Sequence, residues 1–283
     1  MEILEARTTA DRARVADVAR LAFGREHMPP LVHAARRIGS ALCSRASAWL
    51  GTVDGEPVAS LLRYDFTLRR DGERRRAFGL GGVGTHPDHR KKGLATSLCR
   101  EAAERHGGAG LLFSAVPAAF YERLGYVAVP AWEHVCERAD ALAGSGRRAT
   151  LMPLDPRREV DRLAAAWDIA HEGSWHIERD AARWRLTLEI CPNDLWFAVD
   201  AGGYVRIALE KDALEVVERC TPDPDGALRA VAAFAEGRTI TTWLPPDPLL
   251  LVHFEDRGRA TTRPMLRGVG VPETARFSPA DYF

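Results

Sequence analysis

The sequence predicts an α/β (α+β) protein of two similar domains, each with a mixed, mainly antiparallel sheet flanked by helices. Turn pairs such as Asp54-Gly55 and Asp71-Gly72 separate strand-like runs and indicate antiparallel hairpins. A strand, a turn and a helix follow one another between Ala77 and His106. The same order of elements recurs in the second half of the 283-residue chain, which indicates an internal duplication.

The first half contains alternating helices and strands. In order, we expect a strand at 2–6, a helix at 10–23 capped by Thr8 or Thr9, a helix at 31–38, a hairpin of 48–53 and 57–66, a strand ending near Val83, a helix from Gly93, a buried strand at 111–116, a proline-led helix from Pro117 and a strand from Tyr126.

A small, polar, glycine-bearing stretch at 140–146 marks the expected domain boundary, which divides the chain into 1–145 and 146–283. The second half then reads as helices at 157–170 and 179–189, a hairpin of 194–199 and 204–210, a strand at 213–219, a helix at 227–235, a strand at 239–244, a short helix after 245–248 and a last strand at 259–266.

Composition excludes several classes of protein. Lys plus Arg equals Asp plus Glu, 39 each, so we expect no nucleic-acid partner. Five scattered cysteines without a C-x-x-C pair argue against a disulfide framework and against a metal site. No signal peptide and no apolar run of membrane-spanning length is visible, so we expect a cytoplasmic protein that does not enter a membrane. The oligomeric state stays open, a homo-oligomer included.

The stretch from Val83 to Thr96, VGTHPDHRKKGLAT, has the features of an anion site. Pro87 ends the strand because it has no N–H for a ladder. Gly93 allows a close backbone approach where the helix begins. The first N–H groups of that helix have no intrahelical acceptor, and basic residues surround them, which suits a phosphate or pyrophosphate.

Two motifs resemble those of the GNAT superfamily of acyl-CoA-dependent N-acetyltransferases. The pattern R-x-x-G-x-A, formed by Arg90, Gly93 and Ala95, resembles the pyrophosphate loop of GNAT motif A. The string FYERLGY, which contains Tyr121, resembles motif B, where a helix tyrosine lies near the acyl thioester. The resemblance covers about the first half of the chain.

The resemblance implies acetyl-CoA, or a close acyl-CoA, as acyl donor, with no metal. Its pantetheine would pair like an added strand with Val83, Gly84 and Thr85. The strand containing these residues and the strand at 111–116 would separate to leave room for the thioester. Tyr121 would give a proton to the leaving thiolate. The pyrophosphate would lie on Arg90, Lys91, Lys92, Gly93, Leu94, Ala95 and Thr96.

The general base stays open in the sequence. The strand before the anion turn has no glutamate, a residue that many GNAT enzymes carry there. The alternatives are His86, His89, Glu26, His27, a water chain, or the C-terminal carboxylate of Phe283. Glu26 and His27 are also candidate contacts to the acceptor.

The second copy has lost the chemistry of the first. The turn at 221–226 has no R-x-x-G-x-A, and Phe254 stands where Tyr121 stands in the first copy. Tandem GNAT-like halves resemble the Eis (enhanced intracellular survival) group, whose third, sterol-carrier-like domain we do not expect in 283 residues. In that group a terminal carboxylate resembles a built-in base, which makes Phe283 a candidate catalytic residue. Aromatic residues near the end of the chain predict that the tail packs.

Two functions follow from these features. The first is an acetyl-CoA-dependent N-acetyltransferase acting on a primary amine of a small molecule or of lysine. The second is a non-catalytic acyl-CoA-binding sensor or interaction module. Tyr121 and the intact anion turn favour the first, whereas the missing strand glutamate leaves room for the second.

Overall fold

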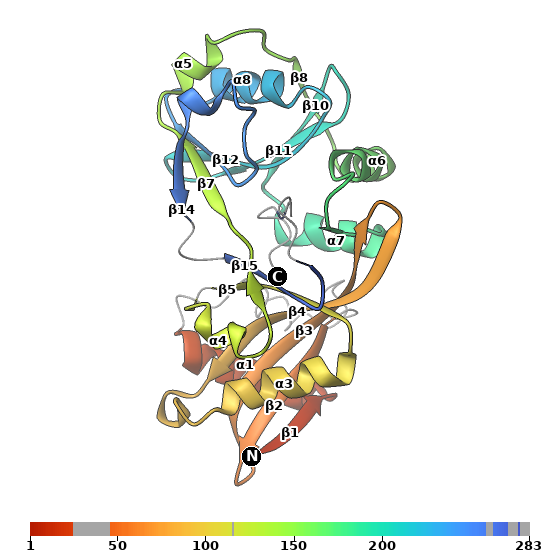
Figure 1. Cartoon of the computed structure of the whole chain (residues 1–283), viewed down its shortest axis with the longest axis vertical. Coiled ribbons are helices and arrows are strands. Elements are labelled where there is room, and N and C mark those ends of the chain that lie inside the picture. Colours follow the sequence, from red (N-terminus) through yellow and green to blue (C-terminus); the bar gives the residue numbers. More distant parts are fainter. Residues whose placement is uncertain (25–45, 115, 259–262, 271–276, 278–283) are drawn as a thin grey trace. The chain divides into compact units, whose positions relative to one another are not determined.

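The computed structural model describes residues 1–24, 46–114, 116–258, 263–270 and 277 (Figure 1). These residues form two compact units. The first unit contains 1–129 together with 263–270, and the second contains 130–258 and Phe277. Each unit has its own mainly antiparallel sheet and its own hydrophobic core, which confirms the predicted fold class.

The first unit is built on a sheet of strand order β1-β2-β3-β4-β5-β15-β6. Neighbours are antiparallel except β4 and β5, which are parallel. The strands are β1 (Glu2–Ala6), β2 (Ala46–Val53), β3 (Glu56–Arg70), β4 (Glu73–Thr85), β5 (Ala109–Ser114), β6 (Val127–Ala128) and β15 (Arg263–Arg267). The expected Asp54-Gly55 and Asp71-Gly72 turns connect β2 to β3 and β3 to β4, and all four turn residues have positive φ.

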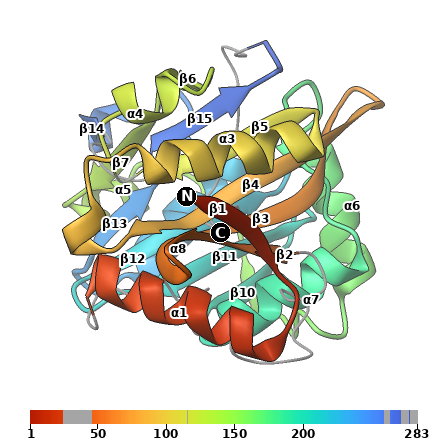
Figure 2. The ribbon, with the colours of Figure 1, turned by 90° about the horizontal axis from the view of Figure 1, so that it is seen from below.

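Helices lie on both faces of this sheet, with α1 and α3 on opposite sides (Figure 2). The helical segments are α1 (Thr9–Phe23), η2 (Pro87–His89), α3 (Leu94–His106) and α4 (Ala119–Glu122). Thr8 caps α1, as expected, and Asp11 completes a capping box. The core of this unit contains Trp49, Phe78, Leu98 and Tyr126.

The second unit repeats this plan with a sheet of strand order β14-β7-β13-β12-β11-β10-β8. Its one parallel pair is β12 and β13, the counterpart of β4 and β5. The strands are β7 (Trp132–Cys136), β8 (Leu151–Pro153), β10 (Leu195–Val199), β11 (Tyr204–Leu209), β12 (Ala213–Cys220), β13 (Thr239–Thr242) and β14 (Glu255–Gly258). The two-residue strand β9 (His176–Ile177) is not part of this sheet. The helical segments are α5 (Ala139–Ala143), α6 (Val160–Ala170), α7 (Ala181–Ile190), α8 (Pro224–Phe234) and η3 (Leu251–His253).

Two cores cover the two faces of the second sheet. One contains residues of α5 and α8, among them Leu142 and Val231, against Val205 and Ile207 of β11. The other contains Trp167 of α6 and Trp184 of α7 with Trp196 and Tyr204 of the sheet. Period-two alternation along β11 sends Tyr204 and Val205 to these different cores.

The two units exchange one strand each, which the sequence did not indicate. β15 lies between β5 and β6, and β7 lies between β13 and β14, so each sheet takes its penultimate strand from the other half of the chain. The strand expected at 259–266 to finish the second half therefore completes the first sheet instead, as β15. The units also differ from the contiguous division into 1–145 and 146–283: the chain passes to the second unit at Pro130, and α5 occupies the expected boundary.

No helix in the described part of the chain is long and apolar enough to span a bilayer.

Candidate functional site

β4 and β5 pair along only part of their length. The parallel ladder joins Ala77, Phe78 and Gly79 to Ala109, Gly110 and Leu111 and then ends. β4 continues to Thr85, while the end of β5 pairs with β15 on its other side. The segment Val83–Thr85 therefore has no ladder to β5, in agreement with the expected separation of these strands. Among the described residues no strand pairs with the backbone groups on that side, so they are open to another partner.

A β-bulge lies in this segment of β4. Between the pairs Ser60–Gly84 and Leu62–Gly81, β4 advances by one residue more than β3. Gly82 has φ +57°, a conformation that glycine adopts without a Cβ clash. The bulge locally redirects the backbone N–H and C=O groups beside Val83.

Residues far away in the sequence hold the bulge in place. The buried Ser60 hydroxyl donates a hydrogen bond to the Gly82 carbonyl oxygen at 3.4 Å. At Gly84 a Cβ would come within 2.9 Å of the Cβ of Ala22, in the last turn of α1. Gly84 is thus needed because helix and strand approach closely there. Ser60 carries no motif signal, so sequence reasoning missed it.

The turn after β4 leads directly to the N-terminus of α3. Lys91 has φ +62° and Gly93 has φ +76°, so two residues of this short turn are left-handed. A non-glycine residue rarely takes this conformation, and it is one of those found in anion-binding backbone nests. The first intrahelical bond at this end runs from Ser97 N to Gly93 O, at 3.0 Å. The N–H groups of Leu94, Ala95 and Thr96 precede it and have no acceptor within the helix.

Charge and exposure at this end of α3 suit an anion. Lys91, Lys92 and Gly93 are exposed, and a Cβ on Gly93 would meet no atom within 4 Å. The first turn of α3 has no acidic residue and no side-chain cap. The positive end of the helix dipole and the two lysines therefore act at the same open place.

Arg90 has a second role that the motif did not indicate. Its Nη2 donates a hydrogen bond to the carbonyl oxygen of Ala22 at 2.9 Å. That carbonyl belongs to the last turn of α1, where carbonyls have no intrahelical donor. Arg90 thereby ties the C-terminus of α1 to the turn that precedes α3.

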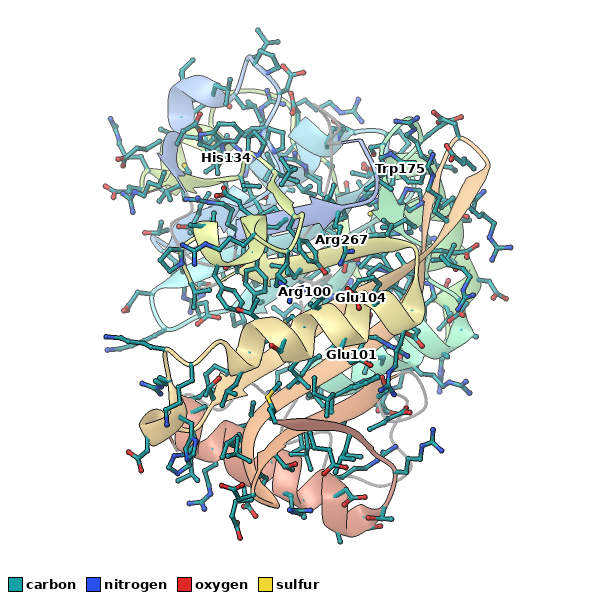
Figure 3. The ribbon with its side chains drawn as sticks, turned by 60° about the horizontal axis from the view of Figure 1, so that its bottom comes forward. Arg100, Glu101, Glu104, His134, Trp175 and Arg267 are labelled. Carbon is teal, nitrogen blue, oxygen red and sulfur yellow. The ribbon has the colours of Figure 1, made fainter. Side chains whose placement is uncertain are left out.

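One face of α3 packs into the core of the first unit, which sets the orientation of the helix. Its inner face carries Leu98, Cys99 and Ala102, all buried, whereas Arg100, Glu101 and Glu104 lie on other faces (Figure 3). Burial raises the pKa of the Cys99 thiol to about 12, so this cysteine is a neutral core residue rather than a nucleophile.

Tyr121 lies in the short helix α4 and is 7% exposed. Its ring meets the rings of Phe120 and Tyr126 edge-on, with centroids 4.7 and 6.0 Å away. The Tyr126 hydroxyl is buried and has no hydrogen-bond partner among the described residues. Burial raises the pKa of Tyr126 further above its already high ordinary value. Tyr121 is the helix tyrosine of the FYERLGY motif, and the ring of Tyr126 packs against it.

The other candidate residues divide into two groups. His86 and His89 lie in the turn before α3, with ring centroids 5.8 Å apart, and the Nδ1 of His86 accepts a hydrogen bond from Asp88 N at 3.3 Å. Glu26, His27 and Phe283 lie outside the described residues. The described residues hold no cluster of three or more His, Cys, Asp or Glu that could bind a metal ion.

The equivalent place in the second unit differs at the helix and not at the strands. The parallel ladder of β12 and β13 ends at Val216 and Thr242, so the end of β12, like the end of β4, has no ladder to its parallel neighbour. At the start of α8 the Oδ1 of Asp223 accepts a hydrogen bond from Gly226 N at 2.9 Å. A carboxylate of the protein thus occupies the helix N-terminus that is open in the first unit.

Comparisons with known proteins agree with this architecture. Residues 5–129 match the family model of the acetyltransferase (GNAT) domain. A probable N-acyltransferase from Enterococcus faecalis V583 has a TM-score of 0.75 at 15% identity, over 95% of this chain and 73% of that one. A GCN5-related N-acetyltransferase from Kribbella flavida has a TM-score of 0.72 at 21% identity, over 96% and 72%. Eis1 from Mycobacterium abscessus has a TM-score of 0.65 at 19% identity, over 94% and 73%.

The first unit therefore contains a GNAT acetyltransferase domain, as its two motifs indicated. The likeness to solved structures extends over both units and includes an Eis protein, and the two sheets fit two GNAT-like domains. The comparison with curated proteins finds no match.

Proposed function

We propose that this protein transfers an acetyl group from acetyl-CoA to a primary amine, carried by a small molecule or by a lysine side chain. The observation that carries the proposal is the combination of an interrupted β4–β5 ladder and an uncapped α3 N-terminus in one unit. The first feature leaves a strand edge for pantetheine, and the second leaves N–H groups for the pyrophosphate.

The donor contacts would follow the backbone. Val83, Gly84 and Thr85 would pair with the pantetheine amides, and the turn from Arg90 to Thr96 would hold the pyrophosphate. Lys91 and Lys92 add positive charge from exposed positions, where each contributes modestly and with strong salt dependence. Arg90 would act mainly by its backbone, because its guanidinium is engaged with Ala22.

The transfer requires attack of the amine on the thioester, cleavage of the C–S bond and removal of a proton from the amine. The amine nitrogen attacks the thioester carbonyl carbon, and the carbonyl oxygen becomes an oxyanion that a backbone N–H of the β4 bulge could stabilise. The C–S bond then breaks, and the CoA thiolate takes a proton, which we assign to the hydroxyl of Tyr121. The amine loses one proton, and the group that accepts it is one of the bases named from the sequence.

The division of labour between the units is part of the proposal. The first unit would bind acetyl-CoA and carry the reaction. The second would be a degenerate GNAT-like domain, because Asp223 fills its helix N-terminus. A phosphate placed there would meet a carboxylate instead of free N–H groups.

Release of free thiol from acetyl-CoA, followed with a panel of polyamines, aminoglycosides and lysine peptides, tests the proposal. Turnover with at least one amine, together with loss of turnover when the amine is replaced by the matching alcohol, would support it. Tight CoA binding without turnover on any amine would favour the non-catalytic acyl-CoA sensor. Absence of CoA binding would overturn both functions.

A further inference from the structure

The hydroxyl of Ser60 is a buried polar group in direct contact with the bulge of β4. Ser60 lies on β3 and is 0% exposed. Its Oγ donates to the carbonyl oxygen of Gly82, a residue 22 positions away in the sequence. Because bulk water does not reach this hydroxyl, its hydrogen bond acts in a medium of low effective dielectric constant, where it is stronger than the same bond in water.

This hydrogen bond sets the direction of one peptide group. The carbonyl of Gly82 and the N–H of Val83 belong to the same planar group, and the described chain has no cis peptide bond, so the two point in opposite directions. The carbonyl points at Ser60 on β3, and the Val83 N–H therefore points away from β3. On its other side, among the described residues, β4 has no ladder to β5 beyond Gly79. The Val83 N–H is thus directed to the open edge of β4.

The hydrogen bond also changes the strength of the N–H as a donor. A donor placed on an amide oxygen polarises the whole amide, so the N–H of the same peptide group becomes more positive. An N–H that is oriented and polarised before the reaction stabilises a developing negative charge without reorganisation. Ser60 therefore supplies both properties to the Val83 N–H from the opposite end of the peptide group.

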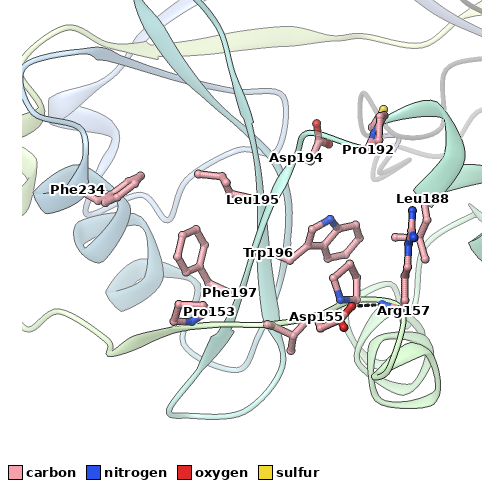
Figure 4. A pocket seen from close by; sticks show the side chains of 13 residues that line it. Pro153, Asp155, Arg157, Leu188, Pro192, Asp194, Leu195, Trp196, Phe197 and Phe234 are labelled. Atoms are coloured by element: carbon pink, nitrogen blue, oxygen red, sulfur yellow. Dashed lines mark hydrogen bonds between the residues drawn. The ribbon is translucent and has the colours of Figure 1, made fainter.

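The second unit shows that a bulge at the equivalent place does not require such a hydrogen bond. β12 advances by one residue more than β11 just after the pair Arg206–Glu218. Arg206 Nη1 donates to Glu218 Oε1 at 2.7 Å, and its Nε donates to Asp194, which lines a cavity of about 500 Å³ (Figure 4). An ion pair thus stands beside this bulge, and it has no hydroxyl to place on a peptide carbonyl. The hydroxyl contact belongs to the unit that carries the donor motif.

We propose that Ser60 is a positioning residue for acetyl transfer, which holds the Gly82–Val83 peptide so that the Val83 N–H meets the thioester oxygen. This inference rests on the proposed function. As the amine forms its bond to carbon, the π electrons of the carbonyl move to the oxygen, and they return when the C–S bond breaks and its electron pair leaves with sulfur. The Val83 N–H stabilises the oxygen between these two steps. Ser60 keeps its own proton throughout.

Ser60→Ala tests this role by removing the hydroxyl. We expect kcat at saturating amine to fall about tenfold, while the KM for acetyl-CoA and the Kd of CoA stay within about twofold, because the lost interaction acts on the charged intermediate more than on the bound thioester. The fall should be smaller than the roughly 10²–10³-fold loss that follows removal of a whole oxyanion donor. An unchanged kcat with a raised KM would assign Ser60 to donor binding and overturn the proposal.

Thr52→Val is the matched control. Thr52 is 3% exposed on β2, and its Oγ1 donates to the carbonyl oxygen of Glu2 at 3.5 Å, so the variant removes the same kind of hydrogen bond from the same sheet. We expect similar shifts of Tm in both variants and a fall in kcat in Ser60→Ala alone. An equal fall in kcat in Thr52→Val would reduce the effect to general destabilisation and overturn the proposal. If Ser60→Ala does not fold, Ser60→Cys fills the site with only a weak S–H donor, and the same fall in kcat is expected.

Infrared spectroscopy reads the effect of Ser60 without turnover. The carbonyl band of acetyl-CoA, isotope-labelled at its carbonyl carbon, should move to lower frequency on binding, because the Val83 N–H polarises the thioester. The shift should be smaller in Ser60→Ala, and an equal shift in both proteins would overturn the proposal while leaving acetyl transfer intact. A smaller shift in the variant of a protein that acetylates no amine would keep Ser60 assigned to the Val83 N–H and overturn acetyl transfer instead.

Discussion

The carboxylate of Asp223 accepts a hydrogen bond from the backbone N–H of Gly226, at 2.9 Å from Oδ1. At the corresponding point of the first unit, Gly93 has no side chain, and the N-terminus of α3 stays open. One unit thus caps its helix with its own anion, and the other leaves the place for a ligand. The difference gives the first two predictions.

Gly93→Val should weaken binding of CoA by about tenfold or more, because a branched side chain cannot easily adopt φ +76° and would project into the phosphate approach. Calorimetric titration with CoA measures the effect. Gly72→Val is the matched control: it imposes the same backbone strain at φ +81°, at the tip of the β3–β4 hairpin. Unchanged CoA affinity in folded Gly93→Val would show that the turn is not the pyrophosphate site.

Asp223→Ala should lower the free energy of unfolding by about 1 kcal/mol, because α8 loses its N-cap. Chemical denaturation compares it with Asp212→Ala, at an exposed turn where no such loss is expected. The variant should not gain a second CoA site, since the turn at 221–226 has no R-x-x-G-x-A and Asp225 stays in the first turn of α8. A stoichiometry of two CoA per chain would contradict the assignment of one donor site.

Tyr121→Phe should reduce turnover by about 10²-fold while leaving acetyl-CoA affinity nearly unchanged, because it removes only a proton donor. Initial rates and a CoA titration separate the two effects. Tyr126→Phe is a suitable comparison, since that buried hydroxyl has no partner among the described residues and its loss should cost little activity. Full turnover in Tyr121→Phe would reduce Tyr121 to a packing residue.

The second unit should lose stability in acid through Glu218. Burial opposes ionisation of this carboxyl, but Arg179 and Arg206 outweigh burial and lower its pKa from 4.5 to about 2. A folded-state pKa below the unfolded value stabilises the fold above the unfolded pKa, and this contribution is lost as pH falls from about 4.5 towards 2. Denaturation at several pH values should show the decline.

Glu218→Gln removes this titration. It takes the Glu218 charge away from the buried Arg179 and leaves the buried Arg206 with Asp194 as its charged partner. We expect a loss of about 3–5 kcal/mol at neutral pH and a weaker dependence of stability on pH below 4.5. Glu215→Gln, on the same strand but only half-buried, is the control. An unchanged acid profile in Glu218→Gln would assign the acid sensitivity to other carboxylates.

The chain terminus offers a separate test of the general base. Phe277 is buried at 5% exposure, which confirms the predicted packing for this residue of the tail. If the carboxylate of Phe283 is the base, one added glycine after Phe283 should cut turnover and preserve CoA binding. Deletion of 281–283 shows whether those residues contribute to stability. Full activity in both variants would remove the tail from the mechanism.

Local signals in the sequence predicted much of the first unit. The Asp-Gly turns, the capping Thr8 and the turn before Gly93 each depend on a backbone requirement that few residues meet. The structure confirms the turns, the helix cap and the left-handed glycine at the positions of these signals.

Features that depend on distant residues were not predictable. Trp132–Cys136 is a strand, yet Glu133 and His134 interrupt its apolar pattern, and its two neighbours come from the end of the chain. Arg206 and Glu218 look like solvent-facing strand residues, but each is 1% exposed because the other neutralises it. Ser60 and Ala22 support the donor site only through pairing and helix packing that no local pattern encodes.

The exchange of β7 and β15 bears on how the protein is made. β6 pairs only with β15 in the described part of the first sheet, and β15 begins at Arg263. During synthesis the first sheet must therefore wait with an open edge beside β5 until the residues up to Arg267 have left the ribosome. Such long sequence separation between paired strands slows folding. Expression of residues 1–145 alone would leave that edge permanently open, so aggregation is expected from the isolated domain even though it contains the complete donor motif.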